Sequence, residues 1–94
     1  MSTHRRVQVD ITADDIERGK PNSVFACPVA RALDRTFPGS SPEVLDAFIY
    51  LDGRAVEAPD EVMEFVARYD LGSRCSPFSF GLQWDEATGR WAAA

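Results

Sequence analysis

Hydrophobic and polar residues alternate near both ends of the chain, a pattern typical of half-buried β-strands. From Arg5 to Ile11, every second residue from Val7 onward is apolar. From Pro77 to Trp84, aromatic residues and one leucine alternate with small or polar residues. We therefore predict a strand near each end of the fold, each with one apolar face turned toward the core.

Three further segments carry the start and stop signals of short helices. Thr12 is a suitable N-cap for a helix from Ala13 to Arg18, with acidic residues in its first turn. Pro28 occupies the first position of a second helix, which ends before Pro38. A third helix begins after Pro59 and has apolar residues at i, i+3, i+4 and i+7.

The middle of the chain predicts a β-hairpin. Residues Val44 to Leu51 have high β-propensity and lead into Asp52-Gly53, a favoured two-residue turn, with a return strand from Arg54 to Glu57. Apolar residues occupy both faces of the strand from Val44 to Leu51. Helices on both sides of the strand would explain this pattern, and so would a face that meets another protein or a second copy of the chain. Both explanations stay open.

The predicted order of elements is therefore β-α-α-β-β-α-β. This order indicates an α+β domain, in which a four-stranded sheet packs one apolar face against its helices. A chain of 94 residues has room for one core. We expect residues 1–94 to form a single domain, with residues 1–4 and 92–94 mobile at its ends.

Charge narrows the classes of partner. The net charge is −5 and the pI is about 4.7, and the residues after position 47 include four basic and eight acidic side chains. Binding to a phosphate backbone requires a basic face, so we expect no direct nucleic-acid binding and a protein partner with a basic surface. No apolar run is long enough to span a bilayer, and the first residues lack the apolar core of a secretory signal, which predicts a cytoplasmic protein that does not bind membranes.

Cys27 is the strongest candidate for chemistry. It precedes Pro28 and so lies at a helix N-cap, where unpaired N–H groups can lower the pKa of a thiol and make it reactive. A cysteine enzyme also needs a base, and His4 is the only histidine. A small thiol-dependent enzyme or redox sensor built on Cys27 is one alternative, and a buried packing residue is the other.

The remaining inventory predicts a protein without cofactor, metal or catalytic residues. Cys27, Cys75 and His4 are too few to form a zinc site, and the acidic residues lack the spacing of a calcium loop. Two cysteines in so short a chain do not make a disulfide framework, and we expect two separate thiols. The chain is therefore predicted not to be an enzyme.

Aromatic residues near acidic ones suit a surface that binds a partner rich in arginine and lysine. The candidate binding residues are Phe48, Tyr50, Glu57, Glu61 and Glu64. They favour a non-enzymatic acidic protein-binding module. Self-association as a homodimer, through the strand with two apolar faces, is a further alternative.

Two segments, Ile11 to Gly19 and Cys27 to Leu33, resemble a pattern found in small proteins of actinobacteria and their phages. Pro77 to Phe80 extends the resemblance over most of the chain. The pattern carries no assigned chemistry. The resemblance implies a short acidic accessory protein, encoded by a phage or prophage, that inhibits host defence by occupying a basic nucleic-acid-binding surface of a host protein.

Overall fold

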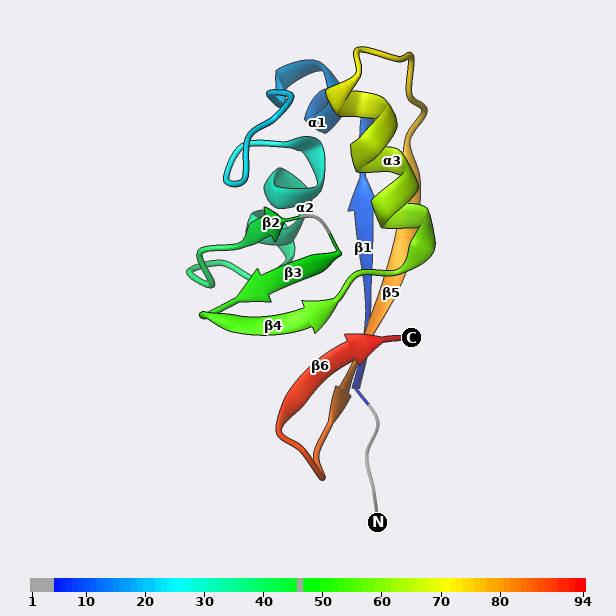
Figure 1. Ribbon diagram of the computed structural model, residues 1–94. Helices are drawn as coiled ribbons and strands as arrows, with labels where there is room; N and C mark the ends of the chain where they lie inside the picture. Colours follow the sequence, from blue (N-terminus) through cyan, green and yellow to red (C-terminus); the bar gives the residue numbers. More distant parts are fainter. Residues whose placement is uncertain (1–4, 46) are drawn as a thin grey trace.

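The computed structural model describes residues 5–45 and 47–94, which form three helices and two antiparallel three-stranded sheets (Figure 1). The first sheet has the order β1-β5-β6 and contains β1 (Arg5–Ile11), β5 (Phe78–Asp85) and β6 (Arg90–Ala93). The second sheet has the order β2-β3-β4 and contains β2 (Glu43–Leu45), β3 (Phe48–Leu51) and β4 (Arg54–Glu57). The α+β class is confirmed, whereas the prediction of one four-stranded sheet was wrong.

The first reason is that the predicted strand from Val44 to Leu51 is two strands. Val44 lies opposite Ile49 and Leu45 lies opposite Phe48, so the chain reverses direction between β2 and β3. Val44 and Ile49 are buried, whereas Leu45 and Phe48 are exposed. The apolar residues that seemed to cover both faces of one strand therefore belong to two paired strands. Val44 and Ile49 lie together on the inward face, and Leu45 and Phe48 lie together on the outward face.

The second reason is that, among the described residues, the strands from the two ends of the chain pair with each other and not with the middle strands. β1 runs antiparallel to β5, with Arg5 opposite Trp84 and Ile11 opposite Phe78, and β6 folds back onto β5. β4 and β6 lie side by side but belong to different sheets. Periodicity shows which residues of a strand share a face but not which strands pair, so this division was not readable from sequence.

The three helices are confirmed as α1 (Ala13–Arg18), α2 (Pro28–Thr36) and α3 (Asp60–Asp70). Thr12 caps α1 through a reciprocal pair of hydrogen bonds with Asp15. Gly19 follows α1 and has a φ of −66°, so it does not adopt the left-handed conformation that often requires a glycine at a helix end. A Cβ at this position would lie 2.7 Å from both the Asp15 carbonyl oxygen and Pro28 Cδ, so the glycine permits the close approach of α1 and α2.

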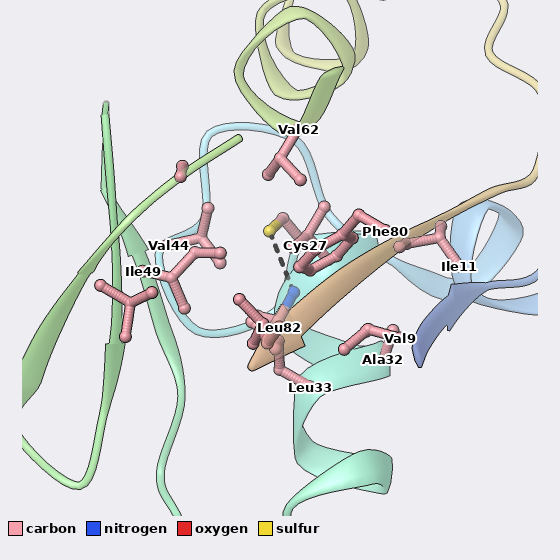
Figure 2. Close-up of a cluster of buried hydrophobic side chains, with 14 of the residues drawn as sticks. Val9, Ile11, Cys27, Ala32, Leu33, Val44, Ile49, Val62, Phe80 and Leu82 are labelled. Carbon is pink, nitrogen blue, oxygen red and sulfur yellow. Dashed lines mark hydrogen bonds between the residues drawn. The ribbon is translucent and has the colours of Figure 1, made fainter. Parts of the chain in front are cut away.

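One core lies between the two sheets, and side chains of α2 and α3 pack into it (Figure 2). The first sheet contributes Val9, Ile11, Phe80 and Leu82, α2 contributes Val29 and Leu33, and the second sheet and α3 contribute Val44, Ile49 and Val62. All of these side chains are buried. Ala92 and Ala93, which were expected at a mobile end, belong to β6, and residues 1–4 lie outside the described residues.

Candidate functional site

The outward side of the second sheet is the main candidate surface. Because side chains alternate along a strand, residues between the buried positions of β2, β3 and β4 turn away from the core. We call this surface the aromatic–acidic face, and it consists of Glu43, Leu45, Phe48, Tyr50, Ala55 and Glu57. The relative exposure is 40% for Leu45 and 44% for Phe48. The Phe48 and Tyr50 rings lie 6.5 Å apart, centroid to centroid.

The strand register places a carboxylate opposite each aromatic ring of this face. Glu57 lies opposite Phe48, and Glu43 lies opposite Tyr50. Arg54 lies opposite the buried Leu51, on the other side of the sheet, where its guanidinium donates a 2.8 Å hydrogen bond to the Gly89 carbonyl. The strand residues of the aromatic–acidic face therefore combine apolar area with two negative charges and no positive charge.

The sequence-based set of binding residues divides between two surfaces. Phe48, Tyr50 and Glu57 share the aromatic–acidic face. Glu61 and Glu64 instead line a hollow of about 310 Å³ beside the segment that joins α3 to β5. That hollow also includes the side chains Arg68, Arg74 and Phe78, so its charge is mixed. The side of α3 that borders β2 carries Met63 and Val66 instead.

Cys27 is the N-cap of α2, as predicted, but its thiol is buried. Its Sγ accepts a 3.4 Å hydrogen bond from the Ala30 N–H, and only 2% of the residue is exposed (Figure 2). Burial raises the pKa of the Cys27 thiol, and the backbone hydrogen bonds at the helix start offset this effect only in part. The negative charge of Asp70 acts in the same direction as burial. These surroundings favour a packing role over an activated nucleophile.

The other groups of the thiol hypothesis are Cys75 and His4. Cys75 is half-buried, and both cysteines are free thiols. His4, the only histidine, lies outside the described residues. The residues that the structure describes therefore contain no histidine to act as the base, and the carboxylate charge that acts on the Cys27 thiol, that of Asp70, raises its pKa.

A buried ion pair that the sequence did not reveal joins α1, α2 and β1. The Asp15 carboxylate is fully buried and accepts hydrogen bonds of 2.9 and 2.8 Å from Arg35. Burial alone would raise the pKa of Asp15, but hydrogen bonds from Arg35 and Thr12 outweigh burial and lower the pKa to about 2. Arg35 also donates a 2.8 Å hydrogen bond to the Asp10 carbonyl. This cluster joins α1, α2 and β1 through hydrogen bonds and an ion pair, so we assign it a structural role.

An aromatic cleft of about 730 Å³ lies between the β3–β4 turn, the end of α2 and the β5–β6 hairpin. Trp91 lies in β6, which folds back onto β5, and contacts Phe37 and Trp84 at ring-centroid distances of 5.0 and 5.4 Å. Ser40 lines the same cleft, and its buried hydroxyl has no hydrogen-bond partner among the described residues. The remaining lining includes one arginine and one aspartate, so the charge of the cleft is balanced.

Comparisons with other proteins add no family to this geometry: no family model, curated protein or solved structure matches the chain. The resemblance to small actinobacterial and phage proteins therefore stays a prediction. Within residues 5–45 and 47–94, no group of three histidine, cysteine, aspartate or glutamate side chains is arranged to hold a metal ion. In the same ranges, no helix has both the length and the apolar character needed to cross a membrane.

Proposed function

We propose that this protein is a non-enzymatic binding module that uses the aromatic–acidic face to bind a protein with a basic surface. The observation that carries the proposal is the composition of that face. Leu45, Phe48 and Tyr50 are at least partly exposed beside two carboxylates, and none of the six strand residues that define the face is basic. An outward sheet surface of this kind has apolar area to bury and negative charge to complement.

The two components have different tasks in such an interface. Aromatic side chains at the centre lose their remaining contact with water and supply most of the affinity. Carboxylates at the edge steer a basic partner and select its orientation, and salt weakens their effect. The net charge of −5 extends the same attraction over the whole molecule.

The resemblance to small phage proteins adds one more step to the proposal. It suggests that the partner is a nucleic-acid-binding protein of host defence, whose basic surface this chain would occupy. A negatively charged face that competes for such a surface needs no catalytic group.

The test compares two charge reversals of equal size on different surfaces. Tagged wild-type protein, Glu57→Lys and Glu61→Lys are used to capture proteins from a lysate of the source cells, at low and at moderate salt. We expect a basic protein that binds wild type and Glu61→Lys, is lost as salt rises, and binds Glu57→Lys roughly tenfold more weakly. Phe48→Ala should also bind this basic protein more weakly than wild type does.

Two results would contradict the proposal. Equal loss of binding by Glu57→Lys and Glu61→Lys would indicate attraction to the overall charge rather than to one face. If Phe48→Ala captured the partner as well as wild type does, the aromatic–acidic face would not be part of the interface. Thermal unfolding of each variant verifies that the fold is intact.

A further inference from the structure

β1 is an outer strand of the first sheet. It pairs with β5 over all seven of its residues, from Arg5 opposite Trp84 to Ile11 opposite Phe78. Among the described residues, no strand pairs with its other edge. Such an edge presents backbone donors and acceptors to any strand that can lie beside it.

Two hydrogen bonds show which backbone groups point toward that free edge. Gly81 lies opposite Gln8, and its carbonyl accepts a hydrogen bond from the Ala94 N–H on the β6 side, so it is turned away from β1. The Asp10 carbonyl accepts from Arg35, so it is turned away from β5. In an antiparallel ladder the backbone groups alternate in direction along the strand. Arg6, Gln8 and Asp10 therefore direct their N–H and C=O groups outward.

The sequence of β1 is complementary to itself when it is read in the opposite direction. We infer that β1 pairs antiparallel with β1 of a second copy of this chain, about a two-fold axis at Gln8. In this register all seven residues are paired, Arg6 lies opposite Asp10 of the second copy, and Val7 lies opposite Val9 of the second copy. A two-fold axis at Arg6 or at Asp10 would instead place like charges opposite each other, which is unfavourable.

The side chains of the inferred contact are free to make it. Arg6 is exposed and forms no ion pair with the described residues. Asp10 is exposed, and its Oδ1 accepts hydrogen bonds of 2.6 Å from Ser79 and 2.7 Å from Gln8, which leaves Oδ2 for a guanidinium. Those two hydrogen bonds hold the pKa of Asp10 below its ordinary value, so the carboxylate is charged at neutral pH.

Within residues 5–45 and 47–94, Arg35 is the one side chain that donates a hydrogen bond to the backbone of β1 at this edge. It occupies one lone pair of the Asp10 carbonyl, and a carbonyl oxygen has two. The charge of Arg35 is paired with the buried Asp15 carboxylate. The edge can therefore accept an incoming strand without losing this ion pair.

The dimer would be weak and in equilibrium with the monomer. Pairing about Gln8 forms about six backbone hydrogen bonds and joins two sheets into one of six strands. The contact is one strand wide, which corresponds to the small, transient class of interface. Sedimentation velocity of the untagged chain should show a mass that rises with concentration from 10.4 kDa toward twice that value.

The decisive test is a mixing experiment with two charge reversals. In Arg6→Glu, two negative side chains meet at each end of the paired strands, and in Asp10→Arg, two positive side chains meet. Each variant alone should therefore dimerise at least about tenfold more weakly than wild type.

An equimolar mixture of the two variants should dimerise again. At one end of the mixed pair the introduced glutamate meets the introduced arginine, and at the other end the native Asp10 of the first variant meets the native Arg6 of the second. Both ends then join opposite charges, as in wild type. Arg74→Glu, an exposed loop position with the same charge change as Arg6→Glu, is the matched control and should dimerise as wild type does.

A further variant tests the backbone part of the contact. Gln8→Pro removes an N–H that points outward and leaves the pairing of β1 with β5 intact, so it should weaken the dimer with little change in fold. Far-UV circular dichroism verifies the fold of every variant. A wild-type chain that stays monomeric at all concentrations overturns the inference. So does a dimer that Arg6→Glu and Gln8→Pro leave unchanged, or one that the mixture fails to restore.

The outcome is independent of the proposed function. Phe48→Ala alters the aromatic–acidic face and not β1, so it should leave this dimer intact. A dimer that depends on Phe48 and not on Arg6 would overturn the inference and show instead that the aromatic–acidic face binds a second copy.

Discussion

The two sheets have the same number of strands and share one core, yet their outward faces differ in kind. The outward face of the first sheet carries Arg6, Gln8, Asp10 and Ser79, a polar mixture of both charges. The outward face of the second sheet carries Leu45, Phe48 and Tyr50 with two glutamates. Burial accounts for the inward residues of both sheets equally well, so the difference in the outward residues is the better guide to function.

The two sheets also offer different kinds of binding surface. The first sheet offers a backbone edge, and the charges beside that edge are arranged so that they match a second copy. The second sheet offers side-chain area with one sign of charge, which suits a partner of different composition. A protein of this size can therefore carry two contacts that do not compete.

The largest expected difference in stability is between two alanine variants, one at an inward residue of the first sheet and one at an outward residue of the second. Leu82 is fully buried, so Leu82→Ala should lower the free energy of unfolding by about 2–5 kcal/mol, because the mutation removes apolar burial and leaves a cavity. Phe48→Ala should change it by less than about 0.5 kcal/mol, because the ring is already 44% exposed. Urea unfolding of both variants measures the difference. A similar loss of unfolding free energy in both variants would mean that Phe48 stabilises the fold, which would contradict its assignment to a binding surface.

The next effect concerns the buried carboxylate that ties the end of the first sheet to α1 and α2. Since the pKa of Asp15 is about 2 in the folded protein and 3.8 ordinarily, its charged form contributes about 2 kcal/mol of stability. This contribution is fully present above about pH 4 and is lost as the pH falls through about 2. Asp15→Asn should therefore be about 2 kcal/mol less stable than wild type at neutral pH, and the gap should close toward pH 2.

The control for this prediction is the neighbouring Asp14→Asn. The Asp14 side chain is 61% exposed in its ion pair with Arg18, so the change should cost less than about 1 kcal/mol at any pH. Urea unfolding over a series of pH values measures both variants. A gap for Asp15→Asn that stays constant down to pH 2 would show that the carboxylate stabilises by shape rather than by charge.

Much of the fold was predictable because its signals are local. The capped helix after Thr12, the proline that starts α2 and the Asp52-Gly53 turn each depend on neighbouring residues, and all three are confirmed. The pairing of β1 with β5 depends on residues about 70 positions apart, and no local pattern encodes it. The reversal after Leu45 was missed because the only interruption of the β-prone run is the pair Asp46-Ala47, which contains neither glycine nor proline to mark a turn.

The candidate site was predictable for the same reason and to the same extent. Phe48 and Glu57 were grouped because aromatic and acidic residues together suit a basic partner, and the hairpin register places them opposite each other. Glu61 and Glu64 were grouped with them by nearness in sequence, but these two residues line a hollow together with Arg68, Arg74 and Phe78. The Asp15–Arg35 pair and the cleft at Trp84 and Trp91 arise from tertiary contacts, which hydrophobic periodicity does not report.

The smallest expected effect on stability is a difference between the β3–β4 hairpin and the β5–β6 hairpin. Gly53 and Gly89 have φ values of +75° and +65°, and a Cβ at either would meet nothing within 4 Å, so alanine at either costs only backbone strain of about 1 kcal/mol. The β3–β4 hairpin buries Ile49, Leu51 and Val56 in the core, so Gly53→Ala should lower the global free energy of unfolding by that amount. The tip of the β5–β6 hairpin has no fully buried side chain, so it can open without global unfolding, and Gly89→Ala should cost clearly less in the same urea titration. Equal losses would show that the two hairpins unfold as one unit and would remove this difference between the sheets.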